Sequence, residues 1–176
     1  MLKASEINNT NDSFGCVMFE LDIPGWPDII SKIDIEDLSE KGLEEWAHCT
    51  VLYGIHDWDE PTEKVKKLIM QFEPPEVELG KISLFQNENF DVVKIDVDSS
   101  DLAKMNKYLI DNLHSTVKFQ EYHAHVTIAY VKPGAGKKYE GMKIAIPQNK
   151  LTLKKVVYST SEKKKTTFYL KDNKDE

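Results

Sequence analysis

The chain has 176 residues, a hydrophobic fraction of 40% and a net charge of -7, enough apolar material for one globular domain or for two small lobes that share a core. It contains no arginine. Because long nucleic acids are held mainly through many Lys and Arg contacts to phosphates, a long duplex or a long RNA is a poor candidate partner. No apolar run approaches the ~20 residues of a membrane span, and residues 1–13 lack the hydrophobic stretch of a signal peptide, so we expect a cytoplasmic protein without membrane contact.

We divide the chain into a flexible lead-in over residues 1–13 and a single two-lobed domain over residues 14–176. Alternating apolar and β-branched residues indicate strands, and apolar residues at helical spacing indicate amphipathic helices. The patterns predict, in order, a strand (15–23), a short helix (28–33), a surface loop with a helical turn (34–45), a strand (48–55), a helix from Pro61 to the Pro74-Pro75 pair, two strands (77–85 and 92–97), a helix (102–113), a strand (125–131), a Gly/Lys loop (132–141) and three further strands (142–146, 151–158 and 166–170).

Two of the predicted strands carry copies of one short motif. Residues 48–53 and residues 125–130 both follow the pattern His-x-Thr-apolar-apolar-Tyr. Side chains two apart on a strand point to the same face, so each motif presents one imidazole and one hydroxyl on a common face. The same alternation sends three apolar residues and, unless a bulge intervenes, both tyrosines to the opposite, packed face. These back-facing residues are Val51, Val126, Ile128, Tyr53 and Tyr130.

Each motif strand has an amphipathic helix and further strands nearby. This is a weak internal duplication of about half the chain, and it indicates two similar lobes of an α+β fold. The three strands at the carboxyl end have no counterpart in the first half. They form either an appended hairpin or part of the sheet of the second lobe.

Two histidines on facing strands indicate acid–base chemistry at phosphorus. Histidine titrates near neutrality, so one imidazole can accept a proton from the attacking oxygen while a second donates one to the leaving oxygen. The phosphate oxygens between them need hydrogen-bond donors, which Thr50 and Thr127 are placed to supply. In a chain without arginine, backbone N–H groups and a lysine are the other available donors.

The two motifs, 77 residues apart, resemble those of the 2H phosphoesterase superfamily, which includes 2′-5′ RNA ligase-like proteins and enzymes that open cyclic nucleotides. The resemblance covers roughly residues 15–131. It implies a two-lobed α+β fold with pseudo-twofold duplicated sheets, flanking helices and a central cleft. It also implies that His48 and His125 are the catalytic acid–base pair, that Thr50 and Thr127 hold the phosphate, and that neither a metal nor a cofactor is needed.

Two further features bear on the resemblance. Residues 158–161, between strands, are more faintly similar to viral members of the family. Many 2′-5′ RNA ligase-like members have an arginine five residues after the second histidine, where this chain has Tyr130. The missing basic contact argues against long RNA substrates.

Other motifs have plainer interpretations. His123 and His125 alternate as in a two-histidine metal site, with Glu121 on the same face, but no other ligand lies close in sequence, so His123 is interpreted as lining the cleft and contributing to substrate binding. Trp58, just past the first motif strand, either stacks on a base at the cleft mouth or packs at the edge. The Gly/Lys loop lacks the spacing of a phosphate-binding loop. Cys49 is interpreted as a small buried residue, not a reactive thiol.

We therefore expect a monomeric, metal-independent phosphodiesterase acting on a cyclic nucleotide or a small cyclic oligonucleotide. If the viral similarity holds, its role is to destroy a cyclic nucleotide signal of host defence. One alternative is RNA-end processing, either by opening 2′,3′-cyclic phosphates or by joining 2′-5′ ends. Another alternative is a binding protein that sequesters a nucleotide without turning it over.

Overall fold

The structure is a computed structural model that describes residues 13–119 and 121–172. Apart from Ser13, the predicted flexible lead-in lies outside these residues. Within them, nine strands form one continuous sheet in the order β7-β4-β5-β6-β3-β1-β8-β9, with β2 also paired to β6. The strands are β1 (Gly15–Glu20), β2 (Leu38–Leu43), β3 (His48–Ile55), β4 (Glu76–Gln86), β5 (Asp91–Asp98), β6 (His125–Val131), β7 (Lys150–Thr152), β8 (Lys155–Ser159) and β9 (Lys165–Tyr169).

Three α-helices and two short 3-10 helices complete the described fold: α1 (Trp26–Ser31), η2 (Ile35–Asp37), α2 (Thr62–Ile69), α3 (Ser100–Asn112) and η3 (Ala135–Tyr139). The longest, α3, begins where the Ser99 hydroxyl accepts a hydrogen bond from the Leu102 backbone N–H at 3.2 Å. Its buried residues Leu102, Met105 and Leu109 follow helical spacing. None of the helices in the described part of the chain is long and apolar enough to cross a membrane.

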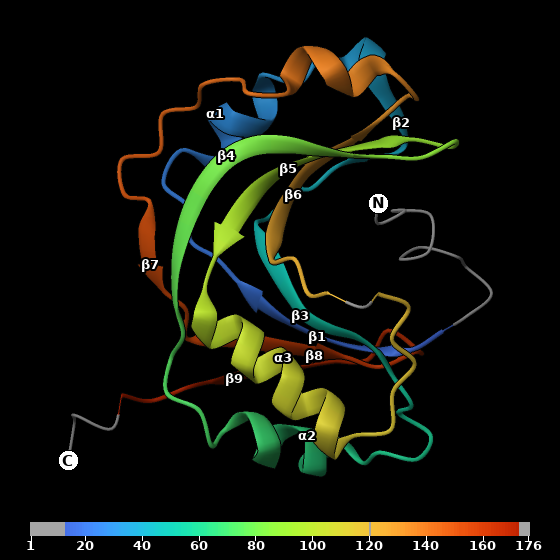
Figure 1. The fold of residues 1–176 in the computed structure, drawn as a ribbon, viewed down its shortest axis with the longest axis vertical. Coiled ribbons are helices and arrows are strands. Elements are labelled where there is room, and N and C mark those ends of the chain that lie inside the picture. Colours follow the sequence, from blue (N-terminus) through green and yellow to red (C-terminus); the bar gives the residue numbers. More distant parts are fainter. Residues whose placement is uncertain (1–12, 120, 173–176) are drawn as a thin grey trace.

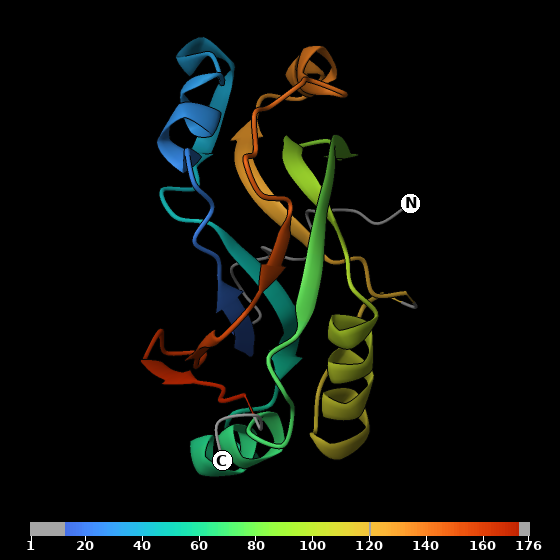
Figure 2. The same ribbon diagram turned by 90° about the vertical axis from the view of Figure 1, so that its left-hand side faces the viewer.

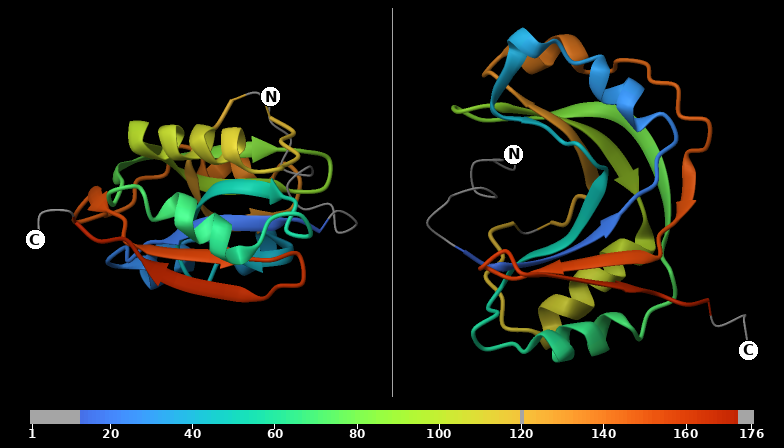
Figure 3. Two further views of the ribbon diagram at one scale, coloured as in Figure 1. Left: turned by 90° about the horizontal axis from the view of Figure 1, so that it is seen from below. Right: turned by 180° about the vertical axis from the view of Figure 1, so that it is seen from behind.

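The sheet is strongly curled, so that the molecule has the shape of a C in Figure 1 and, seen from behind, in Figure 3. Helices α2 and α3 cover the outer side of one arm, while α1 and η3 cover the outer side of the other. Figure 2 shows the same arrangement from the side, with α2 and α3 together at one end. The hydrophobic core lies between the sheet and these helices, and the concave face of the sheet is left for a site.

The predicted α+β fold with two duplicated lobes is confirmed. Strand β3 is flanked by β1, and β6 is flanked by β5, all antiparallel. The two motif strands then meet each other through the antiparallel pair Cys49–Val126. The lobes therefore share one sheet, and the two motifs lie at its centre.

A second strand-like contact beside β3 has its counterpart beside β6. The segment at Ser115 forms a single bridge with Ile55 at the end of β3, much as β2 pairs with the end of β6. Gly54 permits this approach, because a Cβ atom there would lie 2.1 Å from the Thr116 carbonyl oxygen and its φ is +113°. Backbone hydrogen bonds from His56 to His114 and from Thr116 to Gly54 fix residues 114–116 against the end of β3.

Three sequence predictions about the strands are wrong. Residues 34–45, predicted as a surface loop with a helical turn, do contain a helical turn, η2, but they also form β2, whose register with β6 is irregular. Residues 142–146 alternate in burial but form no strand. Their apolar side chains pack against the core without a hydrogen-bonded partner strand.

The predicted strand at 151–158 is two strands at different places in the sheet. β7 pairs with β4, whereas β8 pairs with β1. The carboxyl-terminal strands are thus divided between the lobes: β7 extends the second lobe, and the β8–β9 hairpin extends the first. Neither of the two predicted placements describes this division.

Candidate active site

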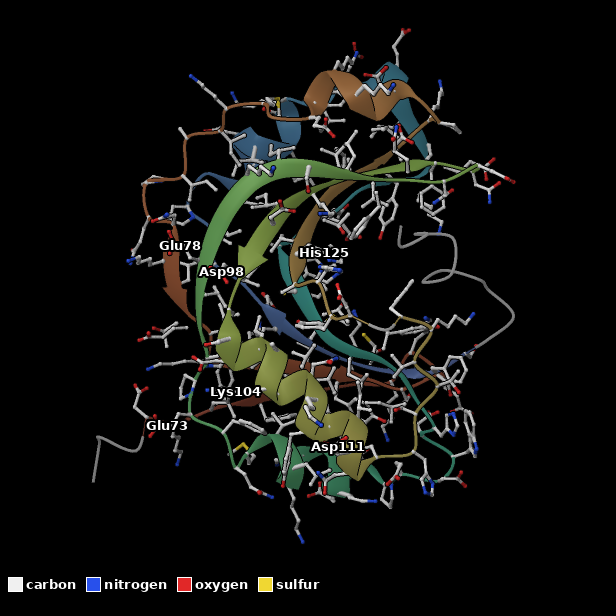
Figure 4. The ribbon with its side chains drawn as sticks, in the orientation of Figure 1. Glu73, Glu78, Asp98, Lys104, Asp111 and His125 are labelled. Carbon is white, nitrogen blue, oxygen red and sulfur yellow. The ribbon has the colours of Figure 1, made fainter. Side chains whose placement is uncertain are left out.

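β3 and β6 are neighbours in the sheet, and we call the point where they pair, at Cys49–Val126, the crossing. The crossing brings both motifs onto one face of the sheet. The four motif residues come directly before and after this pair: His48 and Thr50 on β3, and His125 and Thr127 on β6. All four predicted motif residues line one cavity of about 380 Å³. Figure 4 shows the His125 side chain on the concave side of the sheet. The structure therefore assembles the four side chains that the sequence places half a chain apart.

Both imidazoles are oriented by a carbonyl group two residues earlier. His125 Nδ1 lies 2.8 Å from the His123 carbonyl oxygen, and His48 Nδ1 lies 3.4 Å from the Trp46 carbonyl oxygen. Because a carbonyl oxygen can only accept, Nδ1 is the protonated nitrogen in each neutral ring. The other nitrogen, Nε2, is left as the atom that exchanges protons with a ligand.

The surroundings of His125 keep it neutral. Its pKa is lowered from 6.5 to about 4, mainly by burial and in smaller part by the positive charges of Lys94 and His48, against the opposing effects of the His123 carbonyl and Asp96. The ring also meets the Phe85 ring edge-to-face at 5.0 Å. At neutral pH the Nε2 atom of His125 therefore carries a free electron pair.

A buried lysine lies beside this histidine. Lys94, whose side chain is 8% exposed, pairs with Thr127 across β5 and β6. Its Nζ donates to the Ser83 hydroxyl at 2.6 Å and to the Asp96 carboxylate at 2.7 Å, and it lies 4.2 Å from the centre of the Phe85 ring. This fixed cation next to Thr127 supplies positive charge in a chain without arginine.

The expectation that both tyrosines face the core is wrong, because each motif strand contains a bulge. Along β3 the pairing passes from Thr50 to Leu52 and omits Val51. Along β6 it passes from Thr127 to Ala129 and omits Ile128. An extra residue reverses the alternation beyond it. Both tyrosines, Tyr53 and Tyr130, therefore line the cavity, whereas Val51, Val126 and Ile128 are fully buried as predicted.

The two bulges lie at equivalent positions and are stabilised in equivalent ways. A bulge leaves a backbone group outside the ladder, and a buried carbonyl without a partner is costly. The Asn106 side-chain amide donates to the Val51 carbonyl oxygen at 2.7 Å. The Glu44 backbone N–H donates to the Ile128 carbonyl oxygen at 3.0 Å. Each bulge is thus stabilised by a hydrogen bond from another segment of the chain.

The comparisons with known proteins agree with this arrangement. The family model of the 2′-5′ RNA ligase superfamily matches residues 23–171. The chain belongs to this superfamily of 2H phosphoesterases. Membership, together with the paired histidines, supports phosphodiesterase or RNA-processing chemistry in general terms. No curated protein sequence matches the chain.

Among solved structures, one has a similar fold and others have a lower structural similarity. Usb1 from Kluyveromyces marxianus with uridine monophosphate is 9% identical, with a TM-score of 0.58 over 90% of this chain and 98% of that chain. LigT from E. coli complexed with ATP is 14% identical, with a TM-score of 0.44 over 91% of this chain and 96% of that chain. At these identities the likeness to Usb1 concerns the fold alone.

Two residues predicted to bind substrate lie differently from the motif residues. His123 lines the cavity with its side chain 52% exposed, and its Nε2 lies 3.5 Å from a carboxylate oxygen of Glu121. Trp58 does not line the cavity. It is 62% exposed and stacks on His56, with the ring centres 4.6 Å apart.

Neither thiol nor a metal cluster offers a different chemistry. Burial raises the pKa of Cys16 to about 11 and that of Cys49 to about 12, so both thiols stay protonated. Among residues 13–119 and 121–172, no three His, Cys, Asp or Glu side chains gather in a way that could hold a metal ion. Within this described part of the chain, the His123–Glu121 pair has no third partner of this kind.

The Gly/Lys loop binds a carboxylate of its own chain. The backbone N–H groups of Gly134 and Gly136 both donate to the Asp91 carboxylate at 3.0 Å. A Cβ atom at Gly136 would lie 2.9 Å from that side chain, so glycine is required for the contact. These two backbone amides are thus used within the chain, in agreement with the interpretation that this is not a phosphate-binding loop.

Sequence reasoning missed several residues of the site. The cavity is lined by aromatic side chains outside the motifs, by the two motif tyrosines predicted to face the core, and by Lys163 from the turn between β8 and β9. Lys94 and Ser83 could have been found only by knowing that β5 and β4 flank the second motif strand. The aromatic lining residues are Phe14, Tyr53, Phe85, Phe119, Tyr122 and Tyr130.

Proposed function

We propose that the protein is a metal-independent phosphodiesterase that hydrolyses a small nucleotide, cyclic or oligonucleotide, by two-histidine acid–base catalysis. One observation carries the proposal: the crossing of β3 and β6 brings two imidazoles and two threonine hydroxyls into one cavity. A phosphodiester between them meets a base on one side, an acid on the other and hydroxyl donors for its oxygens.

His125 is the base in this proposal, since it is the histidine that its surroundings keep neutral. Its Nε2 takes a proton from a water molecule while the water oxygen forms a bond to phosphorus. The bond between phosphorus and the leaving ribose oxygen breaks, and protonated His48 gives its proton to that oxygen. The products are a phosphomonoester and a free hydroxyl group, and proton exchange with solvent restores both histidines.

Thr50 and Thr127 hold the non-bridging oxygens, and Lys94 offsets their charge. Preorganised donors of this kind stabilise the charge that develops in the transition state, and in a partly dehydrated cavity they act more strongly than in water. Lys94 is already fixed by Ser83 and Asp96, so it needs no rearrangement when substrate binds.

The volume of the cavity and the net charge of the chain favour a small ligand. The cavity volume of about 380 Å³ lies near the lower end of the ~300–1,000 Å³ usual for small-molecule sites. The chain carries a net charge of -7 and no arginine, which disfavours a long phosphate backbone. A cyclic nucleotide or a short oligonucleotide satisfies both constraints.

RNA-end processing is the second candidate, and the match to the 2′-5′ RNA ligase superfamily over residues 23–171 favours it. In this alternative the same residues open a terminal 2′,3′-cyclic phosphate or join a 2′-5′ end. Only the end of the RNA would then enter the cavity. The two candidates differ in substrate and share the acid–base machinery.

A turnover screen in the presence of EDTA tests the proposal. The purified protein is incubated with cyclic mono-, di- and trinucleotides and with an RNA that ends in a 2′,3′-cyclic phosphate. The proposal predicts cleavage of a cyclic substrate that is lost in His125→Ala and retained in His114→Ala, a histidine that is 74% exposed and outside the cavity. Cleavage of the RNA end alone favours the second candidate, and tight binding without any turnover supports a sequestering protein.

A further inference from the structure

Each half of the site carries an aromatic pair in addition to its histidine and threonine. Tyr53 meets Phe14 edge-to-face with ring centres 5.8 Å apart, and Tyr130 meets Phe90 edge-to-face at 5.4 Å. Phe14 directly precedes β1, which pairs with β3, and Phe90 directly precedes β5, which pairs with β6. The two pairs are therefore equivalent under the duplication of the fold.

The two tyrosines lie on opposite sides of the catalytic centre. β3 and β6 run antiparallel and meet at Cys49–Val126, and each tyrosine follows its crossing residue by four positions. At about 3.3 Å per residue, each tyrosine Cα lies roughly 10 Å or more from the crossing along its strand. The bulges turn both rings into the cavity. A phosphate held at the crossing thus has an aromatic wall on either side: the first wall is Tyr53 with Phe14, and the second is Tyr130 with Phe90.

The tyrosine of each wall is accessible to a ligand in the cavity. Both tyrosines are only partly buried and line the cavity. The first wall continues outward from Phe14 to His56, whose ring is stacked 5.8 Å away. The second is backed by buried Phe90, with Lys41 Nζ 4.4 Å from its ring centre and 5.5 Å from that of Tyr130. Aromatic side chains flanking a phosphate site are suited to stacking of nucleobases, because every base has a π-face.

We propose that the substrate carries two nucleobases, one on each side of the phosphodiester that is cleaved, and that Tyr53 and Tyr130 each stack against one of them. This inference rests on the proposed function and narrows its substrate class. The substrate is a dinucleotide unit, either linear or part of a cyclic oligonucleotide. A cyclic mononucleotide has one base and can occupy only one wall.

The test compares Tyr53→Leu and Tyr130→Leu on a cyclic dinucleotide and on a cyclic mononucleotide of the same base. Leucine keeps apolar bulk but removes the π-face, so each variant is expected to lower kcat/KM for the dinucleotide about tenfold or more. Tyr53→Phe and Tyr130→Phe keep the ring and are expected to retain most of the rate. With the mononucleotide, at most one of the two leucine variants is expected to have an effect.

Tyr169→Leu is the matched control, because Tyr169 is 59% exposed on β9 and does not line the cavity. Thermal unfolding of each variant separates a lost contact from a lost fold. Loss of dinucleotide turnover in only one leucine variant, or in neither, would overturn the two-base site and leave the phosphodiesterase intact. If no substrate is turned over, the same variants are compared by dinucleotide affinity: dependence on both tyrosines supports the two-base site and contradicts the catalytic proposal.

Discussion

The two halves of the site repeat one pattern but surround it differently. In both, a histidine, a threonine, a bulge and a tyrosine follow one another along the strand. On the neighbouring strand, however, Lys94 lies opposite Thr127 in the second half, whereas Met18 lies opposite Thr50 in the first. Asp96 lies opposite His125, and Glu20 lies opposite His48. The duplication therefore preserved the reacting groups and changed the charge beside them.

This difference between the two halves explains how a duplicated fold could supply an acid from one half and a base from the other. Cleavage of a phosphodiester needs one base and one acid at the same time. Burial, and in smaller part the cation of Lys94, lowers the pKa of His125 and so favours its neutral form. In the first half the acidic partner Glu20 is paired with Lys155 at 2.7 Å, and the place of Lys94 is taken by an uncharged methionine. In the proposed mechanism it is therefore the surroundings, and not the motifs, that distinguish the base from the acid.

Removing either imidazole should have the largest effect. His48→Ala and His125→Ala are each expected to lower kcat by about 10²–10⁴-fold, because each removes one partner in proton transfer. The double variant should lose little more than the worse single variant, since the two act as a unit. Steady-state kinetics on the substrate found in the screen provide the measurement, and independent, multiplying losses would contradict a concerted pair.

The threonine hydroxyls should come next. Thr50→Val and Thr127→Val keep the shape of the side chain and remove the donor, so each is expected to lower kcat by about 10²-fold, as loss of one oxyanion donor does. Thr→Ser at either position keeps the hydroxyl and should restore most of the rate. Equal rates for the valine and serine variants would show that the hydroxyls do not contact the phosphate.

Replacing the buried lysine should make the two halves more alike, with a smaller loss of rate. Lys94→Met places in the second half the residue type found in the first, and it removes a charge that disfavours protonated His125. The pKa of His125 should rise but stay below 6.5, because burial remains, and kcat/KM should fall about tenfold as the phosphate loses a nearby charge. NMR titration of the histidines measures the shift; an unchanged pKa would show that Lys94 does not influence His125.

The sequence alone could predict the parts of the site that depend on local pattern. The bounds of both motif strands, 48–55 and 125–131, are confirmed, because both segments are rich in β-branched and aromatic residues. The shared face of His48 with Thr50 and of His125 with Thr127 follows from alternation alone. These predictions need no knowledge of which strands are neighbours.

The remaining features depend on contacts between distant segments. The bulges at Val51 and Ile128 depend on the register that β3 forms with β1 and that β6 forms with β5. The carbonyl groups of the bulges accept hydrogen bonds from Asn106 and Glu44, which are distant in the sequence. Lys94 lies within a buried apolar run, and only the β5–β6 register shows that it lies beside Thr127. Residues 151–158 look like one strand because the division between β7 and β8 is set by two different partners.

The pH dependence of kcat/KM, measured for the wild type and for both histidine variants, tests the division of roles most directly. Since kcat/KM reports the free enzyme, protonation of His125 should lower it as the pH falls through about 4, well below the ordinary imidazole value of 6.5. This acidic limb should persist in the residual activity of His48→Ala and disappear in His125→Ala. An acidic limb that survives in His125→Ala and is abolished in His48→Ala would reverse the assignment of base and acid and contradict the account.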